Sequence, residues 1–192
     1  MNVIKTTKSR YSKVKQFRIT SPIITRILVV LVLLFLISRF INIKLVLFLI
    51  LVIFANISME NVRLRANLPA DFELSTFSTV LVTMAFGLQW GIFTAIFSKL
   101  FTSFATGNVL ADHIFMIMTY INAALIASLF SAANVLTLGL IIVVINCILM
   151  YLISKNILGL DITSNLSYTL TNLMFNLLVF SIFSQIALRL LI

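Results

Sequence analysis

Seven long apolar segments, separated by short polar breaks, make up most of this chain. They cover residues 23–38, 45–60, 74–88, 90–106, 113–131, 135–154 and 168–190. A membrane-crossing helix needs roughly 20 mostly apolar residues, with about 17 to 25 tolerated. The runs are too long for barrel strands, and they lack the alternation of apolar and polar residues that such strands show. The pattern therefore predicts an all-α, polytopic integral membrane helix bundle with six or seven transmembrane helices.

The polar breaks indicate where these helices end. Residues 60–73 contain five charged side chains and a proline, and the glycine-bounded stretch 87–91 predicts a tight turn. Without that turn, residues 74–106 would form a helix of about 50 Å, far longer than a bilayer core of about 30 Å. The first two apolar segments are short, so six crossings plus one interfacial or re-entrant helix is the alternative to seven.

Composition excludes the soluble classes of protein. Hydrophobic residues make up 61% of the 192 residues and charged residues only 10%, whereas an ordinary soluble domain has about 25% charged residues. A soluble domain of this size leaves about a third of its chain surface exposed, which this apolar sequence does not allow. One histidine, one cysteine and no HExxH, GxSxG or phosphate-binding glycine loop are present. We therefore expect no catalytic residue, no resident metal and no cofactor.

Positive charge is concentrated at the N-terminus. Seven of the 14 basic residues precede residue 27, with no acid among them. We expect residues 1–22 to be a basic, disordered or interfacial cytoplasmic tail, and residues 23–192 to be one transmembrane domain of a multi-pass plasma-membrane protein. The tail anchors the topology and can also bind anionic lipid, at about 1 kcal/mol per basic residue. It lacks a folded platform for nucleic acid. Seven crossings would place the C-terminus on the opposite side.

Small side chains recur at every fourth position along two consecutive segments. They are Ser75, Thr79, Thr83, Gly87, Gly91 and Ala95. This spacing puts them on one helix face and lets another backbone approach closely. The face either packs against the chain's own helices or docks a partner membrane subunit. Because each glycine allows a close turn or a close helix contact, we expect leucine at Gly87 or Gly91 to reduce the yield of folded protein.

Polar residues at mid-depth are the candidates for binding a small-molecule ligand. Lys99 lies about 13 Å along its predicted helix from Trp90, too deep for its stem to reach the interface. A lysine at the bilayer centre costs roughly 2.5–3.5 kcal/mol, so it should face protein or a wet cavity. Asn122 and Asn146 are its expected partners by depth, and Asn176 lies on the last helix. These five residues form either a ligand pocket or a structural network. If Lys99 is structural, Lys99→Met should be neutral or stabilising.

Four further titratable residues lie near the N-terminal ends of the third and fifth segments. They are Asp71, Glu73, Asp112 and His113. Acidic groups at these positions suit the positive end of a helix dipole, which predicts helix capping. A cation or proton site is the alternative interpretation.

One stretch resembles a known family. The sequence LPADFEL (68–74) leads into a Thr/Ser-rich helix, which runs to GLQWG (87–91) and directly into the next helix. This arrangement resembles the core of substrate-binding (S) subunits of energy-coupling factor transporters, and of the related bacterial rod-shape protein MreD. TNLMFN (171–176) also resembles the last helix of the MreD-like branch. Six spans are usual in this family, so residues 23–38 are an addition.

The resemblance implies two different functions. An S subunit would hold a vitamin-like molecule within its bundle, for transport powered by an ATPase module on other chains. An MreD-like protein would be a non-catalytic membrane scaffold for cell-envelope or cell-shape machinery. A polar-lined cavity of roughly 300 Å³ or more favours the transporter, whereas a packed interior favours the scaffold.

Overall fold

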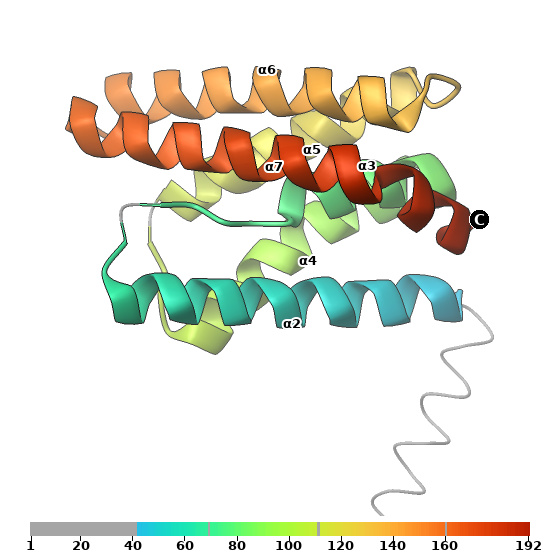
Figure 1. Ribbon diagram of the computed structural model, residues 1–192, viewed down its shortest axis with the longest axis horizontal. Helices are drawn as coiled ribbons and strands as arrows, with labels where there is room; N and C mark the ends of the chain where they lie inside the picture. The colour runs from blue at the N-terminus through green and yellow to red at the C-terminus, as the bar shows by residue number, and fades with distance from the viewer. Residues whose placement is uncertain (1–41, 69, 111, 160) are drawn as a thin grey trace, which may run out of the picture. The chain divides into compact units, whose positions relative to one another are not determined.

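The computed structural model describes residues 42–192 apart from positions 69, 111 and 160, and Figure 1 shows its helices. The predicted tail (1–22) and the predicted helix at 23–38 lie outside the described residues. The helices are α2 (Ile43–Ala66), α3 (Ser75–Phe86), α4 (Leu88–Thr106), α5 (Asp112–Leu129), α6 (Val135–Asn156) and α7 (Ile162–Leu191). The described part of the chain contains no strand, which confirms the all-α prediction there.

Four of these helices are long and apolar enough to cross a membrane: α2, α5, α6 and α7. The 12 residues of α3 extend only about 18 Å, less than the bilayer core of about 30 Å. Helix α4 has 19 residues and is not among the four. Length and composition thus indicate a membrane protein, but they do not by themselves establish six or seven crossings.

Short polar side chains define several helix starts, as N-caps do elsewhere. The Asn42 side chain accepts a hydrogen bond from the Lys44 backbone N–H, and the Asn134 side chain accepts one from Leu136 N–H, each over 2.9 Å. Asp161 accepts from the backbone N–H of the two residues that follow Ile162. The caps at Asn42 and Asn134 start α2 and α6 close to the beginning of their apolar runs, and the Asp161 cap starts α7 six residues before its run at 168–190.

The predicted turn at 87–91 is shorter than the sequence indicated. Gly87 alone makes the reversal, with φ +91°, a backbone conformation that suits glycine. Gly91 lies inside α4, where a Cβ atom would approach Thr83 Oγ1 to 1.9 Å. The first glycine is therefore required by the turn and the second by the close contact between α3 and α4.

The small residues of α3 and α4 face each other within the chain. Ser75, Thr79 and Ala95 have no exposed surface, and Thr83 and Gly91 are also buried; Gly87, at the turn, is exposed. Five of the six positions considered for docking a partner subunit thus lie in an internal contact. Packing between the chain's own helices accounts for their four-residue spacing.

An apolar core joins α3, α6 and α7. The rings of Phe77 and Phe180 meet edge to face, with centroids 5.0 Å apart, and Val80, Leu81 and Ile142 are buried with them. A Cβ atom on Gly139 of α6 would lie 2.1 Å from a carbon of the Phe180 ring. This close approach fixes the spacing of α6 and α7 at the end where α6 begins.

Candidate functional site

The segment between α2 and α3 (residues 70–74) is extended and runs among the helices before α3 begins (Figure 1). Side chains from two helices bond to its backbone. The N–H of Asp71 donates to Thr171 Oγ1 (3.0 Å), the N–H of Leu74 donates to Asn56 Oδ1 (2.8 Å), and Asn176 Nδ2 donates to the carbonyl of Glu73 (3.3 Å). Non-helical backbone at membrane depth needs such partners. They hold the segment in the bundle interior.

Glu73 is the centre of a buried hydrogen-bond cluster. Its carboxylate forms an ion pair with Lys99 Nζ (2.7 Å) and accepts hydrogen bonds from Tyr120 OH (2.8 Å) and Ser75 Oγ. Lys99 is 7% exposed and Glu73 4%. A buried ion pair is tolerated when further hydrogen bonds satisfy its remaining polar atoms, as they do here.

The inward direction predicted for Lys99 is confirmed, but its predicted partners are wrong. Lys99 bonds to Glu73 rather than to Asn122 or Asn146. By their charge and proline, residues 60–73 were predicted to be a break between spans. In the structure, the extended segment brings Glu73 to the level of Lys99. A carboxylate offers the ammonium group a stronger hydrogen bond than an amide does.

The predicted capping role of the acids next to α3 is also wrong. Leu74 is the N-cap of α3 and makes no side-chain capping bond. Glu73 instead turns into the bundle, and Asp71 Oδ2 accepts a hydrogen bond from Asn172 Nδ2 on α7 (2.8 Å). Asp112 does lie in the first turn of α5, where the helix dipole favours it.

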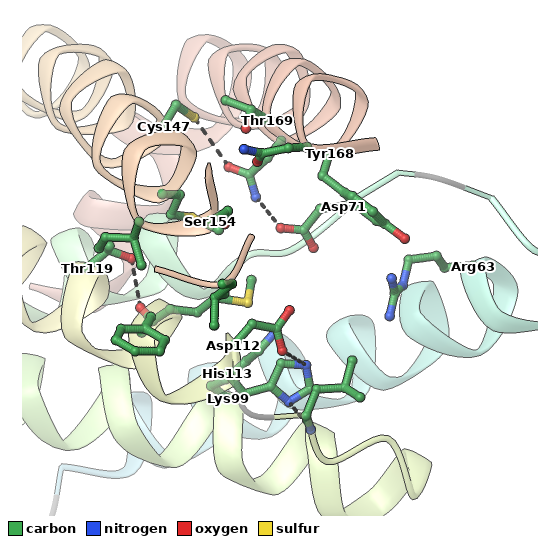
Figure 2. A pocket seen from close by; sticks show the side chains of 18 of the residues that line it. Arg63, Asp71, Lys99, Asp112, His113, Thr119, Cys147, Ser154, Tyr168 and Thr169 are labelled. Carbon is green, nitrogen blue, oxygen red and sulfur yellow. Dashed lines mark hydrogen bonds and ion pairs between the residues drawn. The ribbon is translucent and has the colours of Figure 1, made fainter. Parts of the chain in front are cut away.

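A cavity of about 240 Å³ opens next to this cluster, at the end of the bundle where α2 and α6 end and α5 and α7 begin (Figure 2). This volume is below the roughly 300 Å³ expected for a transporter, but the lining contains many polar side chains. The charged and imidazole side chains that line it are Glu60, Arg63, Asp71, Lys99, Asp112 and His113. Met116, Met150 and Ile153 contribute an apolar wall.

Glu60 and Arg63 form one side of the cavity, near the end of α2. The guanidinium donates to both carboxylate oxygens of Glu60, and Asn108 Nδ2 adds a third hydrogen bond (2.7 Å). The Arg63 guanidinium also lies 5.9 Å from the centre of the Tyr168 ring, within the range of a cation–π contact. Both charges of this pair are therefore engaged within the protein.

Asp71 is less well compensated. One oxygen accepts from Asn172, and the side chain has no Lys or Arg within ion-pair distance among the described residues. The side chain is half-buried, and the negatively charged Glu73 is two residues away. Burial and a nearby like charge both destabilise an ionised carboxylate. The carboxylate is thus the group that a positive ligand would stabilise.

His113 and Asp112 line the cavity from the start of α5. His113 Nδ1 lies 2.8 Å from Ser103 Oγ and accepts a weak hydrogen bond from the N–H of Leu110 (3.5 Å). A neutral ring with its proton on Nε2 fits both contacts. Nε2 is 3.9 Å from Asp112 Oδ1, too far for a hydrogen bond, and this buried oxygen has no other partner among the described residues.

Of the five residues predicted to bind ligand, Lys99 alone lines this cavity. Trp90 is half-buried and packs edge to face on Phe93, with centroids 6.0 Å apart. Asn122 is half-buried away from the lining. Asn146 is buried, and neither polar atom of its amide has a hydrogen-bond partner among residues that the structure describes. Asn176 supports the extended segment. Placement on predicted helices cannot reveal which residues an extended segment brings together.

Among the described residues, no three His, Cys, Asp or Glu side chains are grouped so that they could hold a metal ion. The arrangement can instead bind a small polar molecule between fixed charges and an apolar wall. No protein-family model, curated protein or solved structure matches the chain.

Proposed function

We propose that this chain is the solute-binding membrane subunit of a transporter, and that it works in the manner of the S subunits it resembles. The observation that carries the proposal is the charged cavity at one end of an otherwise apolar bundle. Ionisable groups inside a membrane protein are costly and usually belong to substrate or ion pathways. A chain that needed only to pack would be more stable without them.

The way the cavity is built also supports solute binding. Every charged group in its lining except Asp71 projects from a helix, and Asp71 belongs to a segment fixed by Asn56, Thr171 and Asn176. Side chains held in this way are preorganised, which lowers the entropic cost of binding. Such a site binds its solute without a large rearrangement of the bundle.

The scaffold alternative has less support. It would use a packed interior and small-residue faces that are free for partners. The cavity, although smaller than the roughly 300 Å³ expected of the transporter, shows that the interior is not fully packed. The burial of Ser75, Thr79, Thr83, Gly91 and Ala95 counts against free small-residue faces. The chain contains no nucleotide-binding motif, so transport would require an ATPase and a partner membrane subunit supplied by other chains.

The proposal includes a multi-pass topology in the plasma membrane with a cytoplasmic N-terminus. Segment 70–74 and α3 together would make one crossing, and α2, α4, α5, α6 and α7 five more. If residues 23–38 do not cross, α2 begins at the cytoplasmic side and the cavity faces outward, as uptake requires. If they do cross, the count is seven and the cavity faces the cytoplasm. Reporter fusions at both termini distinguish six crossings from seven. If the protein takes up solute, the reporters at both termini should lie in the cytoplasm.

The decisive experiment is purification of the full chain, followed by mass spectrometry of any small molecule that co-purifies. Two variants make the result specific to the cavity. Ser154→Trp places an indole in the lining and should abolish co-purification. Leu152→Trp, on the exposed face of the same helix, should leave it unchanged. Absence of any bound molecule in the wild type, or its retention in Ser154→Trp, would count against solute binding and favour the scaffold.

A further inference from the structure

The charges around the cavity do not balance. Its lining contains two cations, and each is already paired: Arg63 with Glu60, and Lys99 with Glu73. Asp71 and Asp112 also line the cavity, and within the described part of the chain neither has a Lys or Arg within ion-pair distance. The titratable nitrogen near Asp112 is His113 Nε2, at 3.9 Å. With His113 in the neutral form that fits its contacts, both carboxylates lack a positive partner among the described residues.

We infer that the solute is a small organic cation, such as an amine or amidinium, bound between the carboxylates of Asp71 and Asp112. This inference rests on the proposed function, because it names the class of molecule that the cavity accepts. Figure 2 shows Asp71 entering the cavity from beside α7 and Asp112 from the start of α5. An ammonium group offers three hydrogen-bond donors. Asp112 Oδ1, which is buried and has no hydrogen-bond partner within the described part of the chain, is one available acceptor.

The same contacts make an anionic solute unfavourable. A carboxylate or phosphate ligand would need Lys99 or Arg63, and each is bonded to a glutamate inside the protein. An anion would have to share one of these cations with the glutamate already bonded to it, and it would bring a further negative charge close to Asp71 and Asp112. Like charges at such distances repel strongly in a poorly solvated interior.

The remaining lining indicates an organic body rather than a bare ion. Metal binding needs several converging oxygen, nitrogen or sulfur ligands, and the described residues contain no such group. Met116, Met150 and Ile153 instead form an apolar wall beside the carboxylates. Methionine side chains adapt to irregular apolar shapes. At 240 Å³ the cavity is below the range of about 300–1,000 Å³ that is usual for drug-sized ligands, so the cation is small.

Three probes of nearly equal shape test the inference on the purified full chain. Phenethylamine is cationic at pH 7.5, 2-phenylethanol is its neutral counterpart, and phenylacetate is the anion. We expect phenethylamine to bind in calorimetry and to raise the melting temperature, and the other two to do neither. Asp71→Asn and Asp112→Asn should each weaken phenethylamine binding at least tenfold. Ser154→Trp should abolish it, and Leu152→Trp should not.

Asp161→Asn is the matched control. Asp161 is the one acid of the sequence outside this cluster, and it caps α7, a role that asparagine also performs. The Asp161→Asn variant should therefore bind phenethylamine as tightly as the wild type does. If Asp71→Asn fails to fold, Asp112→Asn at the exposed end of α5 supplies the same test.

Three outcomes would overturn the inference: tighter binding of phenylacetate or 2-phenylethanol, no binding of phenethylamine, or undiminished binding in both carboxylate variants. None of them alone overturns solute binding. A co-purified anion or neutral molecule that is lost in Ser154→Trp would reject the cation and keep the proposed function. The proposed function itself would be rejected if no molecule of any charge co-purified with the wild type and was lost in Ser154→Trp.

Discussion

Helices α6 and α7 lie side by side (Figure 1), and the two ends of their contact differ in chemistry. Where α6 begins, Gly139 lies against the Phe180 ring and the surroundings are apolar. Where α6 ends, Asn165 Nδ2 donates to the Tyr151 carbonyl (3.1 Å), and Cys147 Sγ donates weakly to Asn172 Oδ1 (3.7 Å). Close packing holds the first end together and directional polar contacts the second.

This difference shows how an apolar protein can form a polar site. Lipid is as apolar as leucine, so helices associate in a membrane through close packing and polar contacts rather than the hydrophobic effect. The apolar end gives tight contact that excludes other molecules. The polar end leaves a cavity and carries carboxylates that are imperfectly compensated. We expect substitutions at the apolar end to change stability alone, and substitutions at the polar end to change stability and binding separately.

The largest effect is expected at the buried ion pair. Lys99→Met leaves the carboxylate of Glu73 buried with no positive partner, which typically costs 3–5 kcal/mol. The sequence predicted that this variant would be neutral or stabilising if Lys99 is structural, because the expected partners of Lys99 were the amides of Asn122 and Asn146. The stability of the purified protein against denaturation measures the loss.

The double variant Lys99→Met/Glu73→Gln serves as its control. It removes both charges, so it should recover most of the stability lost by the single change. A single variant as stable as the wild type would show that the ion pair does not contribute to stability.

A smaller effect is expected at the apolar end. Gly139→Val places methyl groups where the Phe180 ring lies, and overpacking of this kind typically costs about 1–3 kcal/mol. Phe180→Leu in the same protein should recover part of the loss, and Val144→Ile on the exposed face of α6 should have no effect. Binding of phenethylamine to the folded fraction should be unchanged. A shift in affinity without a shift in melting temperature would break the proposed separation of the two ends.

Asp71→Asn should act in the opposite sense on stability and binding. The Asp71 carboxylate is half-buried close to Glu73 and has no Lys or Arg within ion-pair distance among the described residues. A buried charge without an ion-pair partner destabilises the folded protein. Asparagine has nearly the same size and no charge, so it should stabilise the empty protein at pH 7 by about 1 kcal/mol.

The groups that act on Asp71 come from four elements. Glu73 in its own segment repels the ionised form, Lys99 on α4 and Arg63 on α2 favour it, and Asn172 on α7 donates to it. Melting temperatures of the wild type and Asp71→Asn at pH 7.5, without phenethylamine, measure the difference. A variant that melts at a lower temperature than the wild type would show that the charge of Asp71 stabilises the empty protein.

Much of the fold follows from the sequence, because each apolar run from residue 45 onward has its helix. Asn134 and the 155–161 stretch mark helix ends in both the sequence and the structure. The site was harder to predict, because it depends on residues 70–74. A run of charge beside a proline predicts a surface loop, whereas hydrogen bonds from side chains 18 and about 100 residues away hold this one inside. Pairings over such separations leave no periodic signal in a single sequence.

The smallest effect is expected at Trp90, which the sequence placed among the ligand-binding residues. Its ring packs on Phe93 at the far end of α4, and it does not line the cavity. Trp90→Phe keeps an aromatic ring that can pack on Phe93, so stability and phenethylamine affinity should each change by less than about 0.5 kcal/mol. Because Trp90 is the single tryptophan of the sequence, its fluorescence should likewise be unaffected when phenethylamine saturates the wild-type protein. Calorimetry on the variant and a fluorescence titration of the wild type measure both quantities. A tenfold loss of affinity would place the binding site near Trp90, outside the cavity between Asp71 and Asp112.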